Sequence, residues 1–321
     1  MSTSQQADRF SLTEGGILNR ILMVALPIMG TTLLQMAYNL TDMFWLGRLG
    51  GASVAATGTA GMYMWLSVSF MMFGRMGAEI GVSQNKGRGD LISAQAYAQG
   101  GIFVAACLGL LYGLSMFLFR GPLIDVFNIQ EQSVASDAKL YLSIVSVGIP
   151  FDFLGMATVG IFNAMGNSRL PFYFSIICVG LNIVLDPIFI FVLNLGVAGA
   201  ALATVAAQIT GGLLAILALT VLKQRPFPHF RLFSLPKPAF LKQIFLWATP
   251  VVIENFLFTS LTMLVSRLIN GFGSDVMAAN RIGSQIESLT WLIGGGFSSA
   301  LTAFTGQNFG AGKWSRIHKG F

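Results

Sequence analysis

Apolar segments of helical length alternate with short polar segments along the whole chain. Each apolar segment reaches the roughly 20 residues that a helix needs to cross a bilayer. The apolar residues do not alternate with a period of two, which disfavours the strands of a membrane barrel. The expected spanning helices lie near residues 21–46, 52–82, 93–119, 140–163, 170–193, 197–222, 241–270 and 276–305. The pattern therefore predicts an all-α polytopic membrane protein with about eight transmembrane helices.

The first apolar segment contains a carboxylate, Asp42, among Leu, Met and Phe residues. Thr31, Gln35, either Tyr38 or Asn39, and Asp42 follow one another at steps of three or four, so they share one helical face. An ionisable group in hydrocarbon costs at least about 2.5 kcal/mol. We therefore expect Asp42 to face the protein interior or a water-filled cavity.

Two later segments carry polar residues at the same helical spacing. The fifth predicted span contains Asn182 and Asp186, and the sixth contains Thr204 and Gln208. With a rise of about 1.5 Å per residue, Asp42, Asp186 and Thr204 should lie roughly 6–11 Å below the same membrane surface. We expect them to line one pocket, in which two neighbouring carboxylates share a proton or a cation. Asn182 and Thr204 could equally well serve only hydrogen bonds between helices.

Other ionisable residues fall inside the predicted spans. Asp152, Glu254 and Glu287 lie nearer the middle of the membrane and could extend a pathway from the pocket. Arg75 and Glu79 stand one helical turn apart, and this spacing is typical of an ion pair within one helix rather than of a binding site.

An internal repeat relates the two ends of the chain. The segments GVSQNKGRGD and FTGQNFGAGK share glutamine, asparagine and glycine residues at a constant spacing of 223 positions, which also pairs Pro27 with Pro250. The matched residues are Gln84, Asn85, Gly87 and Gly89 with Gln307, Asn308, Gly310 and Gly312. Because the spacing encloses an even number of spans, both copies enter the membrane in the same direction, as in a parallel repeat about the membrane normal.

The repeat predicts the division of the chain. Residues 1–222 should form an N-terminal six-helix lobe, 223–240 a linker rich in proline and basic residues, and 241–321 a partial C-terminal lobe. We expect the second lobe to be incomplete, since only two of its spans are present. At the repeat spacing Asp42 corresponds to Val265, so the acidic pocket should be confined to the first lobe.

Composition and charge narrow the class of protein. Hydrophobic residues make up 54% of the chain and charged residues 10%, which excludes an ordinary soluble domain. The net charge of +6 arises from basic residues between the spans, without the clustering on one face that nucleic acid binding requires. Thirteen of the 19 Lys and Arg residues fall on the N-terminal side of the membrane and three on the other, which predicts a cytoplasmic N-terminus in the cell (inner) membrane.

Several local motifs, taken together, resemble one transporter family. They are Thr41-Asp42 followed by Phe44 and Gly47-Arg48-Leu49-Gly50, the segment Gly87 to Asp90, Ala164 to Arg169, and Asn182 with Asp186-Pro187. Their order along the chain is similar to that of the multidrug and toxic compound extrusion (MATE) transporters, and in particular to the DNA-damage-inducible and prokaryotic proton-coupled branch.

The resemblance implies a twelve-span, V-shaped antiporter, monomeric when full length, in which inward proton or sodium flow drives the export of cationic or amphipathic compounds. It implies a functional cluster at Asp42, Asn182, Asp186 and Thr204, and Glu254 is similar to a glutamate of the sodium-coupled branch. It implies no cofactor beyond the coupling ion, H+ or Na+.

Three alternatives remain at this point. An intramembrane aspartyl protease is disfavoured because the sequences TDM and LDP lack a glycine before the acid, so we do not expect an enzyme. A flippase for lipids or lipid-linked sugars should instead have a groove lined by cationic residues. The third possibility is a fragment that does not transport.

Overall fold

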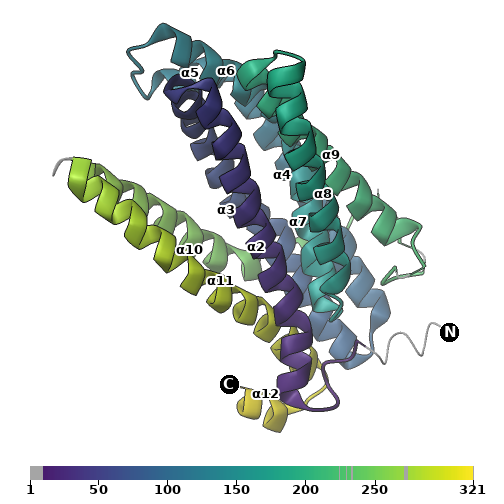
Figure 1. Ribbon diagram of the computed structural model, residues 1–321. Coiled ribbons are helices and arrows are strands. Elements are labelled where there is room, and N and C mark those ends of the chain that lie inside the picture. The colour runs from purple at the N-terminus through teal and green to yellow at the C-terminus, as the bar shows by residue number, and fades with distance from the viewer. Residues whose placement is uncertain (1–9, 224, 229, 233, 271–273, 321) are drawn as a thin grey trace.

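A computed structural model describes residues 10–223, 225–228, 230–232, 234–270 and 274–320. The regular structure of this part is helical, as predicted (Figure 1). In chain order the elements are α2 (Ile17–Leu49), α3 (Gly51–Arg88), α4 (Leu91–Leu118), α5 (Arg120–Asp125), α6 (Gln132–Val145), α7 (Ile149–Ala164), α8 (Arg169–Pro187), the π-helix η1 (Ile188–Val192), α9 (Gly196–Thr220), α10 (Pro238–Asn270), α11 (Ser274–Gly310) and α12 (Trp314–Gly320).

Every predicted span corresponds to helix in the structure. The segments long and apolar enough to cross a membrane are α2, α4, α8 with η1, α9 and the first part of α10. The helices α3 and α11 do not meet the same hydropathy condition, because glycine and polar residues interrupt their apolar runs. The helix α3 runs through the middle of the bundle, whereas α11 leaves the other helices toward the far face (Figure 1).

The fourth span differs from its prediction. A single helix was expected over 140–163, whereas the structure has α6 and α7, bent by 53° at the break between them. Pro150 lies in the first turn of α7 and has no backbone N–H to donate to the preceding turn, which favours the start of a new helix at this position. The bend places the start of α7 inside the bundle.

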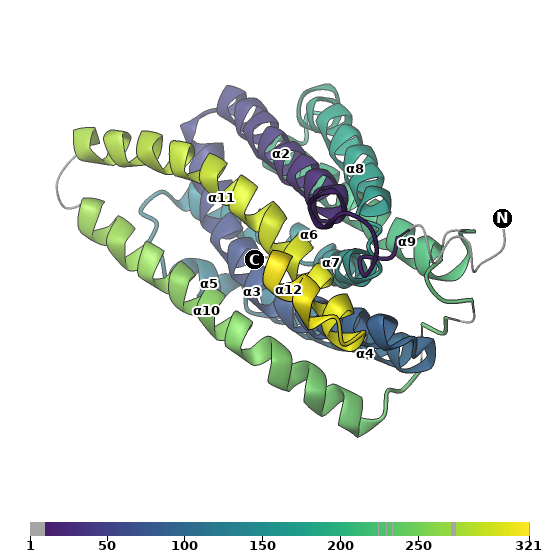
Figure 2. The same cartoon turned by 90° about the horizontal axis from the view of Figure 1, so that it is seen from below.

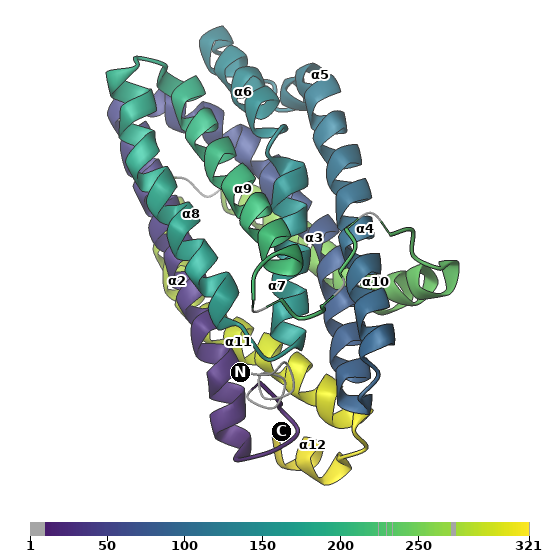
Figure 3. The same cartoon turned by 90° about the vertical axis from the view of Figure 1, so that its right-hand side faces the viewer.

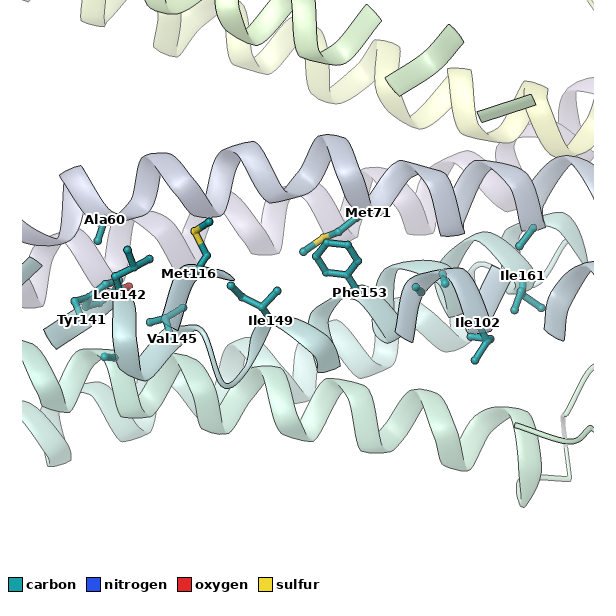
Figure 4. Close-up of a cluster of buried hydrophobic side chains, with 14 of the residues drawn as sticks. Ala60, Met71, Ile102, Met116, Tyr141, Leu142, Val145, Ile149, Phe153 and Ile161 are labelled. Carbon is teal, nitrogen blue, oxygen red and sulfur yellow. The ribbon is translucent and has the colours of Figure 1, made fainter. Parts of the chain in front are cut away.

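The helix α3 is the centre of the molecule. It packs against α4, α6, α7, α10 and α11, while α2 packs against α8 and α11. Between α3, α6 and α7 the side chains of Met71, Ile149 and Phe153 form part of the main hydrophobic core (Figure 4). Close packing of α3 on α4 depends on Gly74 and Gly101, because a Cβ at either would come within 3.0 Å of the partner helix.

The two ends of the bundle differ. We call the end that holds residues 10–16 and α12 the N-terminal face, and the end that holds α5 the far face (Figure 3). Helices α10 and α11 meet the rest of the molecule at the N-terminal face and diverge from α2 toward the far face (Figure 1). Seen along the bundle, α10 and α11 lie on one side and α8 and α9 on the other (Figure 2). The backbones of α2 and α11 are therefore closest near the N-terminal face and farthest apart near the far face (Figure 1).

The structure reproduces the internal repeat locally. The pairs α2–α3 and α10–α11 have nearly equal lengths, 33 and 38 residues against 33 and 37. Asn85 Nδ2 donates to the Gly81 carbonyl at 2.7 Å, and the matching Asn308 Nδ2 donates to the Phe304 carbonyl at 2.8 Å. The repeated asparagines therefore make the same bond one helical turn back. The division into lobes at residues 222 and 241 remains a prediction.

A helix cap marks the turn between α3 and α4. Gly89 has a φ of +78°, in the left-handed region that favours glycine at the end of a helix. Asp90 follows as the N-cap of α4 and accepts a hydrogen bond from the Ser93 backbone N–H at 3.0 Å. Hydrogen bonding from Ser93 lowers the pKa of the Asp90 carboxyl. The Gly87 to Asp90 motif thus reverses the chain at the N-terminal face.

Candidate functional site

A cavity of about 560 Å³ lies between α2, α3, α6, α7 and α9, in the half of the bundle nearer the far face. Its polar lining comes mainly from α2 and α9, and its apolar lining mainly from α3. The polar lining residues are Tyr38, Asn39, Asp42, Thr57, Tyr141, Asp152, Thr204 and Gln208. Five of the residues predicted for the site therefore line one cavity.

The side of the cavity formed by α2 follows from the polar face of that helix. Tyr38 and Asp42 are one turn apart, so both point into the cavity. The Tyr38 hydroxyl lies 3.2 Å from the Thr204 hydroxyl, which joins α2 to α9. Asp42 Oδ1 is buried and has no hydrogen-bond partner among the described residues. This oxygen can therefore bind a cation that enters the cavity, either directly or by accepting a hydrogen bond from it.

Asn182 and Asp186 of α8 are fully buried beside the cavity rather than in its lining. Asn182 Nδ2 donates to Asp186 Oδ1 at 3.4 Å. Asp186 and Asp42 are close enough for their charges to interact, and Tyr38 interacts with both. Of the four residues of the predicted cluster, Asp42 and Thr204 therefore line the cavity, and Asn182 and Asp186 are buried next to Asp42.

The backbone of α8 changes where it meets α9. Pro187 ends the α-helix, and Ile188–Val192 continue as a π-helix, in which Leu193 N–H donates to the Ile188 carbonyl at 2.9 Å. A Cβ at Gly199 would come within 2.6 Å of the Phe189 backbone, so glycine permits α9 to approach this turn closely. Short π-helical turns are frequent at functional sites. Here the turn lies between Asp186 and the start of α9, the helix that carries Thr204.

Asp152 and Gln208 form the deeper end of the cavity. Gln208 contacts the break between α6 and α7 at Gly148, where a Cβ would overlap the Gln208 side chain. Gln208 Oε1 is buried and accepts no hydrogen bond from the part of the chain that the structure describes. The bend of the fourth span thus makes room for Gln208 next to Asp152.

Four buried oxygen atoms of this region have no hydrogen-bond donor within the described residues: Asp42 Oδ1, Asn182 Oδ1, Asp186 Oδ2 and Gln208 Oε1. All four are acceptors. The described residues that line the cavity include no Lys, Arg or His. Buried carboxylates are costly without a countercharge, so the site is suited to a proton, a metal cation or a cationic organic group.

Two predicted carboxylates lie elsewhere. Glu254 is exposed on α10, and Glu287 is exposed on α11, where it accepts a hydrogen bond from Trp291 Nε1 at 3.1 Å. Neither lines the cavity. Their spacing from the N-terminal lobe could not be predicted from sequence, because it depends on how far α10 and α11 diverge from α2.

Arg75 and Glu79 form the predicted pair within α3, with Arg75 Nε 3.5 Å from Glu79 Oε2. Arg75 also donates to Ser299 of α11 at 3.0 Å. This second bond was not predicted, because it joins helices that are more than 200 residues apart in sequence.

Several lining residues were not identified from the sequence. Tyr141 of α6 is buried and lines the cavity with Asp42 and Thr204, and Met43, Met62, Met64 and Trp65 supply apolar surface. A tyrosine in an apolar span was the available signal for Tyr141, since its hydroxyl needs a partner when buried. The methionines resemble ordinary lipid-facing residues in sequence.

Replacing Thr204 with valine should lower the free energy of unfolding by about 1 kcal/mol, because the Tyr38 hydroxyl loses its partner across the helix interface. Unfolding of the purified protein in detergent measures the change. The matched control is Thr210→Val, since Thr210 donates to the Ala206 carbonyl of its own helix. An equal loss in the two variants would show that the hydrogen bond between α2 and α9 stabilises the protein no more than a bond within one helix.

Comparisons with known proteins agree on one family. The MatE family matches residues 27–188 and 250–321. The chain is 28% identical over 309 residues to the probable multidrug resistance protein NorM of Thermotoga maritima and 26% identical over 309 residues to the probable multidrug resistance protein YpnP of Bacillus subtilis. The matches cover 94% and 96% of this chain, which spans 65% and 68% of the lengths of those relatives.

Solved structures show the same fold. A MOP superfamily transporter from Pyrococcus furiosus, whose structure is described as suggesting a different function through reverse polarity of its binding pocket, superimposes with a TM-score of 0.90 at 23% identity. The match covers 100% of this chain and 70% of that one. A MATE crystal structure in complex with MaD3S also has a TM-score of 0.90, at 24% identity, over 97% of this chain and 70% of that one.

Proposed function

This chain belongs to the MatE family, and from that premise we propose that it acts in a secondary active efflux antiporter that exports cationic or amphipathic compounds in exchange for protons or sodium ions. The observation that carries the proposal is the cavity beside Asp42 and Asp186, whose described lining offers carboxylate and amide oxygens without a basic side chain. Such a site attracts cations. The names of the Thermotoga and Bacillus relatives, probable multidrug resistance proteins, support a role in the export of drugs.

The apolar lining supports substrates that combine a charge with a hydrophobic body. A cavity of about 560 Å³ is in the range that encloses a drug-sized molecule, about 300–1,000 Å³. Methionine side chains adapt to different shapes, and Trp65 can attract an organic cation through its ring. The combination favours varied amphipathic cations over one specific metabolite.

Substrate export is coupled to proton entry if protons and substrates compete for the same carboxylates. Protonation of the Asp42–Asp186 pair removes the negative charge that holds a cation, and a bound cation disfavours protonation. Binding one ligand therefore expels the other, which is the requirement for exchange. We assign the shared proton to the pair and to neither residue alone.

The proposed orientation places the N-terminal face in the cytoplasm. It rests on the distribution of Lys and Arg residues along the chain. The cavity, which lies in the half of the bundle nearer the far face, would then be nearer the outside. A monomeric transporter in the cell (inner) membrane, with lipid as its surroundings, completes the proposal.

A lipid or lipid-linked sugar flippase is the second candidate. The Pyrococcus structure shows that a protein of this fold can have a pocket of reversed polarity. A flippase must accommodate an anionic phosphate, for which basic side chains are the usual partners. The acidic lining described above favours cation export instead.

Reconstitution into liposomes tests the proposal. The probe is tetraphenylphosphonium, a permanent organic cation, with an imposed proton gradient, an imposed sodium gradient or none. We expect one of the two gradients to drive its accumulation at least about fivefold over the gradient-free control. YpnP of Bacillus subtilis, assayed in parallel, provides a longer relative for comparison.

Each outcome assigns a function. Movement of a fluorescent phospholipid between leaflets without any gradient would favour the flippase. Binding of tetraphenylphosphonium with no movement under either gradient would identify the chain as a fragment that binds but does not transport. Absence of binding would contradict the proposed cation site.

A further inference from the structure

The segment Phe10–Gly15, directly before α2, is held by its backbone at the N-terminal face. The side chains that bind it come from both copies of the internal repeat. Lys86 Nζ donates to the Phe10 carbonyl at 3.1 Å, and Asn308 Nδ2 donates to the Leu12 carbonyl at 3.2 Å. Lys313 Nζ donates to the Thr13 carbonyl at 3.1 Å. Leu12 itself is fully buried.

Gln307 of α11 makes the central contact. Its Oε1 accepts a hydrogen bond from the Leu12 backbone N–H at 2.9 Å, and its Nε2 donates to the Ala164 carbonyl at 2.7 Å. One fully buried amide thus joins the segment to both α11 and the end of α7. Lys86 makes a parallel link, since its Nζ also donates to the Met165 carbonyl at 2.7 Å.

The turn after α7 is shaped to receive the segment. Gly166 has a φ of +75°, and a Cβ at this position would overlap the Phe10 carbonyl oxygen. A residue other than glycine would therefore be strained and would push the segment away. The segment Ala164 to Arg169, which contributed to the family resemblance, thus has a structural role at the N-terminal face.

The contact is asymmetric between the two repeats. At the spacing of 223 residues, Leu12 corresponds to Leu235, which precedes α10 as Leu12 precedes α2. Leu12 is 0% exposed, whereas Leu235 is 83% exposed. Burial of the segment before the first helix is therefore not a consequence of the repeated fold, and the second copy forms without it.

The segment binds Gln307, whose backbone takes part in a close contact between the repeats. A Cβ at Gly87 of α3 would overlap the Gln307 carbonyl oxygen, and a Cβ at Gly310 of α11 would overlap that of Gln84. These contacts are equivalent under the repeat, so the two helices meet about a local two-fold axis. Ser83, fully buried beside Gly306, lies in the same interface.

We propose that the segment Phe10–Gly15 is a latch that holds α3, α7 and α11 together at the N-terminal face, so that the two repeats separate there only when the segment is released. Its hydrogen bonds are made by its own backbone atoms with Lys86, Gln307, Asn308 and Lys313, and the buried Leu12 side chain adds a hydrophobic contact. Its part in an export cycle rests on the proposed function, whereas its effect on the interface can be measured without transport.

Thiol labelling of a buried position tests the latch. Ser83→Cys, in a chain whose two native cysteines are replaced by alanine, reports whether the interface between the repeats opens. We expect maleimide to label this cysteine slowly in the purified protein. Gln307→Leu should accelerate labelling at least about tenfold, because it removes two buried hydrogen bonds.

The repeat supplies a matched control. Gln84 occupies the equivalent position in the first copy, and its side chain makes none of the described bonds to the latch, so Gln84→Leu should change the labelling rate less than about twofold. Deleting residues 2–15 should accelerate labelling at least as much as Gln307→Leu. Equal rates with and without this segment, in protein that elutes as one folded species, would overturn the proposal. Loss of tetraphenylphosphonium transport with unchanged labelling would concern the proposed function alone.

Discussion

Replacing Asp186 with asparagine is expected to weaken tetraphenylphosphonium binding at least about tenfold, which corresponds to about 1.4 kcal/mol. Asp186 is fully buried beside the cavity, and its charge interacts with that of Asp42. Asparagine keeps the shape of the side chain but removes the charge, so the attraction for a cation falls. The same change should flatten the pH dependence of binding, because the pair no longer exchanges a proton for the cation.

Asp42→Asn should have a similar effect, and the double variant should cost less than the sum of the two, because the carboxylates act as a pair. Glu287→Gln is the matched control, since this carboxylate is exposed on α11 outside the cavity. Titration calorimetry at two pH values on the unchanged protein and the four variants measures all the effects. If Glu287→Gln and Asp186→Asn reduced affinity equally, the effect would be general electrostatics and the acidic pocket would not be the site.

Gly87→Ala is expected to lower the free energy of unfolding by about 2 kcal/mol or more. The added Cβ would overlap the Gln307 carbonyl oxygen, which belongs to the backbone of a long helix and cannot rotate away. The helices α3 and α11 must then separate at the N-terminal face. Denaturant unfolding in detergent measures the loss, and faster labelling of Ser83→Cys should accompany it.

Gly58→Ala provides the comparison within the same helix. A Cβ at Gly58 would have no neighbour within 4 Å, so alanine should leave stability unchanged or raise it by up to about 1 kcal/mol. A loss at Gly58 as large as that at Gly87 would mean that glycine matters for the flexibility of α3 and not for its contact with α11.

The helical segments could be predicted from sequence because a bilayer leaves few alternatives. Backbone polar groups in hydrocarbon must be bonded within the segment, so a long apolar run becomes a helix whatever its neighbours are. The apolar pattern located the fourth span but not the bend within it. The fourth span breaks between α6 and α7, just before Pro150, which cannot donate to the preceding turn, and packing inside the bundle accommodates the bend.

The candidate site was predictable as far as the acids and polar faces of single helices. The cost of a charge in the membrane identified Asp42, and helical spacing aligned Asn182 with Asp186. The apolar half of the cavity was not predictable, because a methionine that lines a cavity and one that contacts lipid occur in the same sequence context. Glu254 and Glu287 show the converse: depth in the membrane made them candidates, but the divergence of α10 and α11 leaves them outside the cavity.

The sequence by itself determined that this protein is a helical membrane protein with a repeated motif and buried acids, because each of these features depends on spacing along one chain. The tertiary structure decided what the features do together. It placed Asp186 beside Asp42 and Tyr38 against Thr204, and it turned the repeated glycines into a contact between the copies. It also buried Leu12 while leaving Leu235 exposed. The two leucines differ because the segment before α2 packs into the interface between α3, α7 and α11, whereas the segment before α10 does not. Periodicity along the sequence does not encode which of the two segments packs there.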